Sequence, residues 1–164
     1  MDSVISNTSP LLYLYRTGIL DWLPKLFNEI WIPSAVIFEL KAGQDRGYDV
    51  PNPHAYEWIT VVEPQHIPSE WLALDLGAGE LASMSLSLEH QNRIILLDDM
   101  LARRTAQAAG LRVWGTLKVL LEGKSQGLTE RIKLHVIRLS KSGMWISDDI
   151  RQRILALAGE IEDV

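Results

Sequence analysis

The hydrophobic and polar positions along the chain form short apolar runs separated by longer segments with helical spacing. The fourth of these runs is apolar from Ile94 to Leu97, as expected of a strand covered on both faces of a parallel sheet. Runs that are apolar or rich in β-branched and aromatic residues predict strands at Val4-Ile5, Glu29–Ile32, Thr60–Val62, Arg93–Leu97 and Arg112–Trp114. The pattern therefore predicts a sheet with at least one fully buried strand.

Most segments between these runs predict helices. Their starts carry hydroxyl, acidic or proline residues, and several of their ends carry glycine. We expect helices over Asn7 to Gly18, Ile19 to Phe27, Pro33 to Gly43, His54 to Trp58, Glu80 to His90, Asp98 to Gly110, Gly115 to Gly127, Glu130 to Leu139 and Asp148 to Leu157, with a loop from Gln44 to Pro53. Thr129 and Ser147 are the expected N-caps of the last two helices.

Strands that alternate with helices predict an α/β fold with a parallel sheet and helices on both of its faces. The length of 164 residues suits one domain with its own core. Internal repeats, low-complexity runs and linkers are lacking in the sequence. We interpret residues 1–164 as a single domain in which residues 129–164 form a C-terminal helical extension.

The composition of the chain limits the classes of protein to which it can belong. Hydrophobic residues make up 47% of the chain and charged residues 23%, which is typical of a globular protein. Apolar runs stay well below the roughly 18 residues that a membrane span needs, so no membrane association is expected. The N-terminus lacks the pattern of a signal peptide. The chain has no cysteine, which excludes disulfides and fits a cytoplasmic location.

Charge is distributed unevenly along the chain. The net charge of −5 argues against nonspecific binding of nucleic acid by the whole surface. Ten of the sixteen lysines and arginines nevertheless lie between residues 93 and 141. This basic segment either supplies one positive face beside the functional site or consists of ordinary solvated helix faces.

Acidic and polar residues follow the predicted strands at the points where ligands bind in open parallel sheets. Asn7, Thr8 and Ser9 come after the first strand, and Asp98 and Asp99 come after the fourth. Glu39 and Glu80 lie on helices near the same edge. Each acid alone is explained as a surface residue, a first-turn acid or an N-cap. Together they predict an acidic cluster at one edge of the sheet.

Such a cluster is unfavourable unless a cation neutralises it, and oxygen ligands favour hard ions such as magnesium or manganese (Mg2+ or Mn2+). These ions support phosphodiester hydrolysis without a protein nucleophile. The four histidines lack the spacing of a zinc site. A phosphate-binding glycine loop and a nucleophile elbow are also lacking. A receiver-like signalling domain is a further alternative, but it would carry its aspartate pair after the first strand, whereas here the pair follows the fourth.

These residues, in order, resemble the PIN-domain family. The resemblance rests on four motifs along the chain, and it covers nearly the whole sequence. They are Val4-Ile5-Ser6-Asn7-Thr8-Ser9-Pro10-Leu11, Ile32-Pro33 with Glu39-Leu40, Gly79-Glu80-Leu81-Ala82, and Leu96-Leu97-Asp98-Asp99 with Ala102-Arg103. Gly110-Leu111 and Gly115-Thr116-Leu117 further resemble a prokaryotic PIN-like subfamily related to VapC toxins.

The resemblance implies a three-layer fold with a five-stranded parallel sheet flanked by helices. It implies a Mg2+- or Mn2+-dependent endoribonuclease that cleaves single-stranded RNA, with an antitoxin protein as partner and a homodimer as the assembly. Carried over by position, the catalytic acids are Glu39, Glu80, Asp98 and Asp99; the metal ligands are these four and Asn7; and the supporting residues are Thr8, Arg103 and Thr116. Which aspartate of the pair faces the metal stays open.

The sequence departs from the family pattern at Asn7, where an aspartate usually ends the first strand. Asparagine offers a neutral oxygen, so we expect weaker metal binding than an aspartate would give. The alternative function is therefore a catalytically impaired PIN-like module that binds RNA or protein.

Overall fold

The computed structural model describes residues 1–160 and contains a five-stranded, all-parallel sheet in the order β3-β2-β1-β4-β5. This confirms the predicted α/β fold. The strands are β1 (Val4–Ser6), β2 (Ile30–Ile32), β3 (Ile59–Val61), β4 (Ile94–Leu96) and β5 (Arg112–Trp114). The helices are α1 (Thr8–Arg16), α2 (Trp22–Leu26), α3 (Ser34–Asp45), α4 (Ala78–Glu89), α5 (Met100–Ala108), α6 (Thr116–Ser125), α7 (Lys133–Lys141) and α8 (Asp148–Leu157), with short 3-10 turns η1 (Pro53–Ala55) and η2 (Ser69–Trp71).

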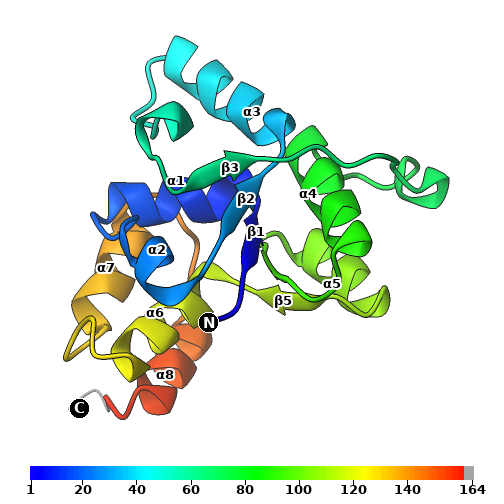
Figure 1. Ribbon diagram of the computed structural model, residues 1–164. Coiled ribbons are helices and arrows are strands. Elements are labelled where there is room, and N and C mark those ends of the chain that lie inside the picture. The colour runs from blue at the N-terminus through cyan, green and yellow to red at the C-terminus, as the bar shows by residue number, and fades with distance from the viewer. Residues whose placement is uncertain (161–164) are drawn as a thin grey trace.

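Helices cover both faces of the sheet in three layers (Figure 1). Helices α1, α2, α6, α7 and α8 lie on one side, and α4 and α5 lie on the other. Strand β4 explains this division, because its side chains alternate between the faces. Ile94 and Leu96 contribute to the larger core, whereas Ile95 contributes to the smaller core under α4 and α5. Strand β4 therefore needs apolar side chains on both of its faces.

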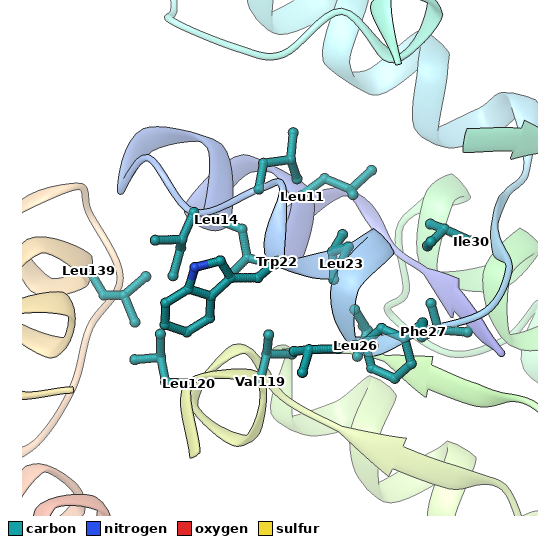
Figure 2. Close-up of a cluster of buried hydrophobic side chains, with 14 of the residues drawn as sticks. Leu11, Leu14, Trp22, Leu23, Leu26, Phe27, Ile30, Val119, Leu120 and Leu139 are labelled. Atoms are coloured by element: carbon teal, nitrogen blue, oxygen red, sulfur yellow. The ribbon is translucent and has the colours of Figure 1, made fainter. Parts of the chain in front are cut away.

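The larger core is centred on the short helix α2 and its neighbours. Figure 2 shows Trp22 lying among Leu14, Leu120 and Leu139, which come from α1, α6 and α7. A methyl group at Gly123 of α6 would lie 2.3 Å from the Trp22 ring, so glycine lets these two helices approach. Residues of α7 and α8 are therefore part of the main core, together with the helices that precede them. Of the C-terminal extension expected over residues 129–164, the last four residues lie outside the described part of the chain.

The strand order places a topological switch between β1 and β4. The chain runs from β1 outward through β2 to β3, then returns to the other side of β1 as β4 and β5. Connections after β1 and β4 therefore leave in opposite directions, which opens a crevice beyond the carboxyl ends of these two strands. Ser6 and Leu96 are paired in register, so Asn7 and the Asp98-Asp99 pair emerge beside one another.

The expected end of the third helix at Gly43 is wrong. Helix α3 continues to Asp45, and Gly43 lies inside it. The residue that ends the helix is Gly47, whose φ of +87° suits glycine. A Cβ on Gly43 would lie 3.3 Å from Val50, so this glycine allows the following loop to fold back on the helix.

Three further boundaries differ from the expectations. The segment expected as a helix from His54 to Trp58 forms only the 3-10 turn η1, which Asn52 caps through the His54 amide. The third strand begins one residue earlier than expected, and α4 begins at Ala78 with Gly77 as its N-cap. The turn ends at Ala55 because the backbone is extended at Tyr56, from where the chain leads into β3.

The expected start of α7 is also too early. The Thr129 hydroxyl donates to the Arg131 carbonyl instead of capping a helix, and α7 begins at Lys133. The start of α7 is capped by a residue that is distant in the sequence, because the Glu160 carboxylate accepts hydrogen bonds from the Ile132 and Lys133 amides. A cap supplied by a residue so distant in sequence leaves no local signal. Helix α8, with its N-cap Ser147, has the expected bounds.

Candidate functional site

A cavity of about 530 Å³ opens beyond the carboxyl ends of β1 and β4. It is lined by Asn7, Thr8, Ser9, Glu39, Ala42, Gly43, Arg46, Glu80 and Asp99. These residues come from the start of α1, one face of α3, the first turn of α4 and the start of α5. The structure therefore brings together Glu39, Glu80 and one aspartate of the Asp98-Asp99 pair.

Asn7 lies at the base of the cavity, immediately after β1. Its side chain is buried, and its Oδ1 atom accepts no hydrogen bond from the described residues. It is the N-cap of α1 by position, yet its side chain does not cap the helix. A buried oxygen without a donor is costly, so the surroundings suit a ligand that would engage it.

Glu39 is held by two donors at the same end of the sheet. The Thr8 hydroxyl donates to its Oε1 at 2.5 Å, and the Gly79 amide donates to its Oε2 at 3.2 Å. A Cβ on Gly79 would clash with this carboxylate and would lie 3.0 Å from Asn7 Oδ1. Glycine at position 79 is therefore what allows α4 to approach Glu39.

Glu80 lies in the first turn of α4, where its Oε1 accepts a hydrogen bond of 2.9 Å from the Gly77 amide. Burial raises the pKa of Glu80, and the nearby Asp99 and Glu39 carboxylates raise this pKa further, against the opposing effect of the Gly77 hydrogen bond. Such repulsion is expected of carboxylates that line one cavity. A bound cation would relieve this repulsion.

The two aspartates after β4 face different surroundings. Asp99 lines the acidic cavity while its Oδ2 caps α5 through the Ala102 amide at 2.9 Å. Asp98 accepts hydrogen bonds from the Thr116 amide at 2.8 Å and from the Thr116 hydroxyl at 2.7 Å. Burial raises the pKa of Asp98, although both Thr116 bonds and Arg103 oppose the rise. Of the pair, Asp99 is the residue that joins Glu39 and Glu80.

Arg103 and Thr116 lie around Asp98 and not in the acidic cavity. The Arg103 guanidinium donates to the Leu97 carbonyl at 3.4 Å and packs so closely on Gly115 that a Cβ there would lie 2.2 Å from it. Asp98 and Arg103 line a second, largely apolar pocket of about 510 Å³ between α5, α6 and α8. The contacts of Asp98 and Thr116 therefore fix the start of α6 against the end of β4.

The donor set of the acidic cavity fits a hard cation in its chemistry. Carboxylates of Glu39, Glu80 and Asp99 and the unsatisfied Asn7 oxygen are the ligand types that Mg2+ and Mn2+ take. Within residues 1–160, however, no three acidic, histidine or cysteine side chains are close enough to hold a metal ion as they stand. Glu39, Glu80 and Asp99 each accept from a backbone amide instead. Their carboxylates would have to move closer together to meet at one ion, while free lone pairs remain on each of them.

The basic segment does not surround this cavity. Arg93 pairs with Glu29 at 3.0 Å and Arg112 pairs with Asp2 at 3.2 Å, both at the opposite, amino-terminal edge of the sheet. None of the described lysines and arginines between 93 and 141 lines the cavity. The lining of the cavity therefore gives no support to a positive face supplied by that segment. The basic residue in the lining is Arg46.

Sequence reasoning missed Gly79 as a packing residue and Arg46 as a cavity residue. The signal for Arg46 was present, because Glu39, Ala42, Gly43 and Arg46 follow the i, i+3, i+4, i+7 spacing of one helix face. Ending the helix at Gly43 moved Arg46 into a loop and hid this relation. Nothing local in the sequence marks how closely Gly79 approaches Glu39.

None of the helices in the described part of the chain is long and apolar enough to cross a membrane.

Comparison with protein families identifies the family to which this fold belongs. The family model DUF3368, described as a PIN domain, matches residues 3–160. Neither the curated proteins nor the solved structures contain a match. A PIN domain indicates a function of the nuclease type, in agreement with the acidic cavity at the switch point of the sheet. Because the match spans nearly all of the sequence, the chain belongs to the PIN-domain family.

Proposed function

We propose that this protein is a metal-dependent endoribonuclease that cleaves single-stranded RNA. The observation that carries the proposal is the cavity at the switch point, which Glu39, Glu80 and Asp99 line together with Asn7, whose side-chain oxygen is unsatisfied. Glu39, Glu80, Asp99 and Asn7 would hold Mg2+ or Mn2+. When bound, such an ion polarises a phosphate and lowers the pKa of a bound water.

The remaining residues position this set. Thr8 and the Gly79 amide orient Glu39 through their hydrogen bonds. Asp98, which we place outside the metal ligands, holds Thr116 and thereby the junction between β4, α5 and α6. Arg103 packs on the same junction, where it balances the buried charge of Asp98. These contacts support Asp99 in its place at the cavity.

Cleavage of a short unstructured RNA in Mn2+ tests the proposal. We expect cleavage by the wild-type chain, loss on chelation, and loss of at least tenfold in Glu39→Gln and in Asp99→Asn, because each variant removes an anionic ligand. Glu57→Gln is the matched control, since Glu57 is exposed and lies outside the cavity. Equal cleavage by all four proteins would contradict the assignment of the site.

Asn7 favours a second candidate function, an impaired PIN-like module that binds RNA or protein without cleaving. A neutral ligand at the base of the cavity contributes less attraction for a cation than an aspartate. Asn7→Asp should therefore tighten Mn2+ binding in calorimetric titration and should increase or create nuclease activity. Unchanged Mn2+ affinity together with a lower melting temperature would favour the binding module.

We also propose a role as the toxin of a toxin–antitoxin pair, with an antitoxin protein as partner and a homodimer as the assembly. The support is the resemblance to the VapC-related subfamily. Induced expression in a bacterial host should arrest growth, and Glu39→Gln should relieve the arrest. Sedimentation of the purified chain tests the dimer. If the chain cleaves RNA in vitro but does not arrest growth, the nuclease activity stands and the role as a toxin is contradicted.

A further inference from the structure

The acidic cavity needs a positive group if a phosphate is to enter it. Its lining carries Glu39, Glu80 and Asp99, and the one basic side chain among the lining residues is Arg46. The net charge of the chain is −5, so the surface as a whole offers little attraction for RNA. A basic side chain within the cavity would therefore mark the cavity as a site for a phosphodiester.

Arg46 is positioned for this task by the two residues that extend α3 beyond Gly43. As the C-cap of α3 it lies two turns after Glu39, and both side chains line the cavity. Ala42 and Gly43 occupy the turn between them. Because these residues are small, they leave the surface open between an acid at one end and a cation at the other.

The Arg46 side chain has no competing partner within the described residues. Acidic residues flank it at 45 and 49, but Asp45 pairs with Lys41 at 3.1 Å. Asp49 accepts from the Tyr15 hydroxyl at 3.1 Å. Among residues 1–160, no hydrogen bond or ion pair involves the Arg46 side chain. Its guanidinium donors are thus available for a ligand.

We propose that Arg46 binds a phosphate of the RNA strand and positions it over the carboxylates of the cavity. The inference rests on the proposed function and names the residue that contacts the substrate backbone. A planar guanidinium matches two phosphate oxygens with paired hydrogen bonds, which a lysine cannot reproduce. A favourable position at the C-terminus of a helix would also explain a cation here, and the test separates the two roles.

The test measures binding of a short oligouridylate at several salt concentrations, with Mn2+ present and with Glu80→Gln as the background that prevents cleavage. Loss of one phosphate contact should reduce the slope of log affinity against log salt by about 0.7. We expect this reduction in Arg46→Ala and in Arg46→Glu, whereas Arg46→Lys, which keeps the charge, should keep the slope but lower the affinity. Lys25→Ala is the control, since Lys25 is an exposed cation that lies outside the cavity, and its loss leaves Asp45 paired with Lys41.

Cleavage assays on the same Arg46 and Lys25 substitutions, made with Glu80 intact, distinguish this inference from the proposed function. We expect Arg46→Ala to lose at least tenfold in cleavage while its melting temperature stays near that of the wild type. If wild type and Arg46→Ala cleave equally and share one salt slope, the role of Arg46 is overturned while the nuclease stands. If the wild type does not cleave but Arg46→Ala still lowers the slope, the phosphate contact stands without the nuclease. Failure of the wild type to bind the oligonucleotide overturns both.

Discussion

Gly79 is the residue on which the approach of α4 to Glu39 depends. A Cβ at this position would lie 2.1 Å from Glu39 Oε1 and 2.9 Å from its Cδ, too close for the carboxylate to stay in place. We expect Gly79→Ala to lower the free energy of unfolding by about 1–3 kcal/mol, as overpacking commonly does. Chemical denaturation measures this change, and Mn2+ titration should show weaker binding.

A double-mutant cycle identifies the cause of that loss. If the clash is with the Glu39 side chain, Gly79→Ala should cost much less when it is introduced into Glu39→Ala. The gain in helix propensity from alanine is the same in both backgrounds, so it cancels from the comparison. An equal loss in the two backgrounds would mean that the added methyl group clashes elsewhere.

Glu80 should make the stability of the metal-free protein depend on pH. Burial and the neighbouring carboxylates raise its pKa in the folded state, so the folded protein holds this proton more tightly than the unfolded chain does. The favourable contribution of the protonated form is present at low pH and is lost as pH rises through the raised pKa. Glu80→Gln, which keeps an oxygen for the Gly77 amide, should therefore gain melting temperature over the wild type near pH 7 but not near pH 4.

Thermal melts in chelator, from about pH 4 to pH 8, measure this difference. Glu57→Gln, a substitution at an exposed position, serves as the control for removing one negative charge. A difference between wild type and Glu80→Gln that stays constant across the whole range would show that repulsion within the cavity does not act on Glu80.

At the scale of elements, sequence pattern located the strands better than the helix ends. The apolar run from Ile94 to Leu97 defines β4 because a strand covered on both faces admits little else. Helix ends depend on the particular glycine that the backbone uses, and α3 ends before Gly47 instead of at Gly43. The apolar stripe predicts a stop at Gly43, the first glycine that follows it. This prediction leaves Arg46 off the helix face that carries Glu39.

The cap of α7 illustrates a contact that local pattern cannot reveal. Glu160 accepts from the Ile132 amide at 2.8 Å, from the Lys133 amide at 3.1 Å and from Lys124 Nζ at 2.9 Å. Burial raises the pKa of Glu160, but these hydrogen bonds and the Lys124 charge outweigh it and lower the pKa below its ordinary value. The ionised form therefore stabilises the fold above the unfolded pKa, and this contribution is lost as pH falls.

We expect Glu160→Gln to lower the free energy of unfolding by about 1 kcal/mol near neutral pH, the usual size of a lost helix cap. The loss should shrink in acid, where the wild-type carboxyl is protonated as well. Urea denaturation near pH 7 and near pH 3 measures both values. Glu130→Gln is the control, because Glu130 is exposed at the place where sequence pattern had expected this helix to begin.

At the scale of the whole molecule, the chain order of strands and helices predicted the parallel sheet, and the resemblance predicted its five strands. The convergence of Glu39, Glu80 and Asp99 follows from that topology, because the carboxyl ends of parallel strands share one edge. The distribution of cations did not follow in the same way. Arg93 and Arg112 pair with acids at the amino-terminal edge of the sheet, whereas Arg103 lies beside Asp98 at the carboxyl edge, so these basic residues do not share one edge.

A metal ion that binds only the folded state should stabilise the entire chain. With Mn2+ at 100 times its dissociation constant, linkage predicts a gain of about 2.7 kcal/mol. For a protein of this size, each kcal/mol raises the melting temperature by roughly 2–4 °C, so we expect a rise of about 5–10 °C that chelator reverses. The double variant Glu39→Gln, Glu80→Gln should be more stable than the wild type in chelator, because it relieves the repulsion around Asp99, but should gain little from Mn2+. An equal rise in both proteins would place the ion elsewhere on the molecule and would leave the acidic cavity without its proposed cation.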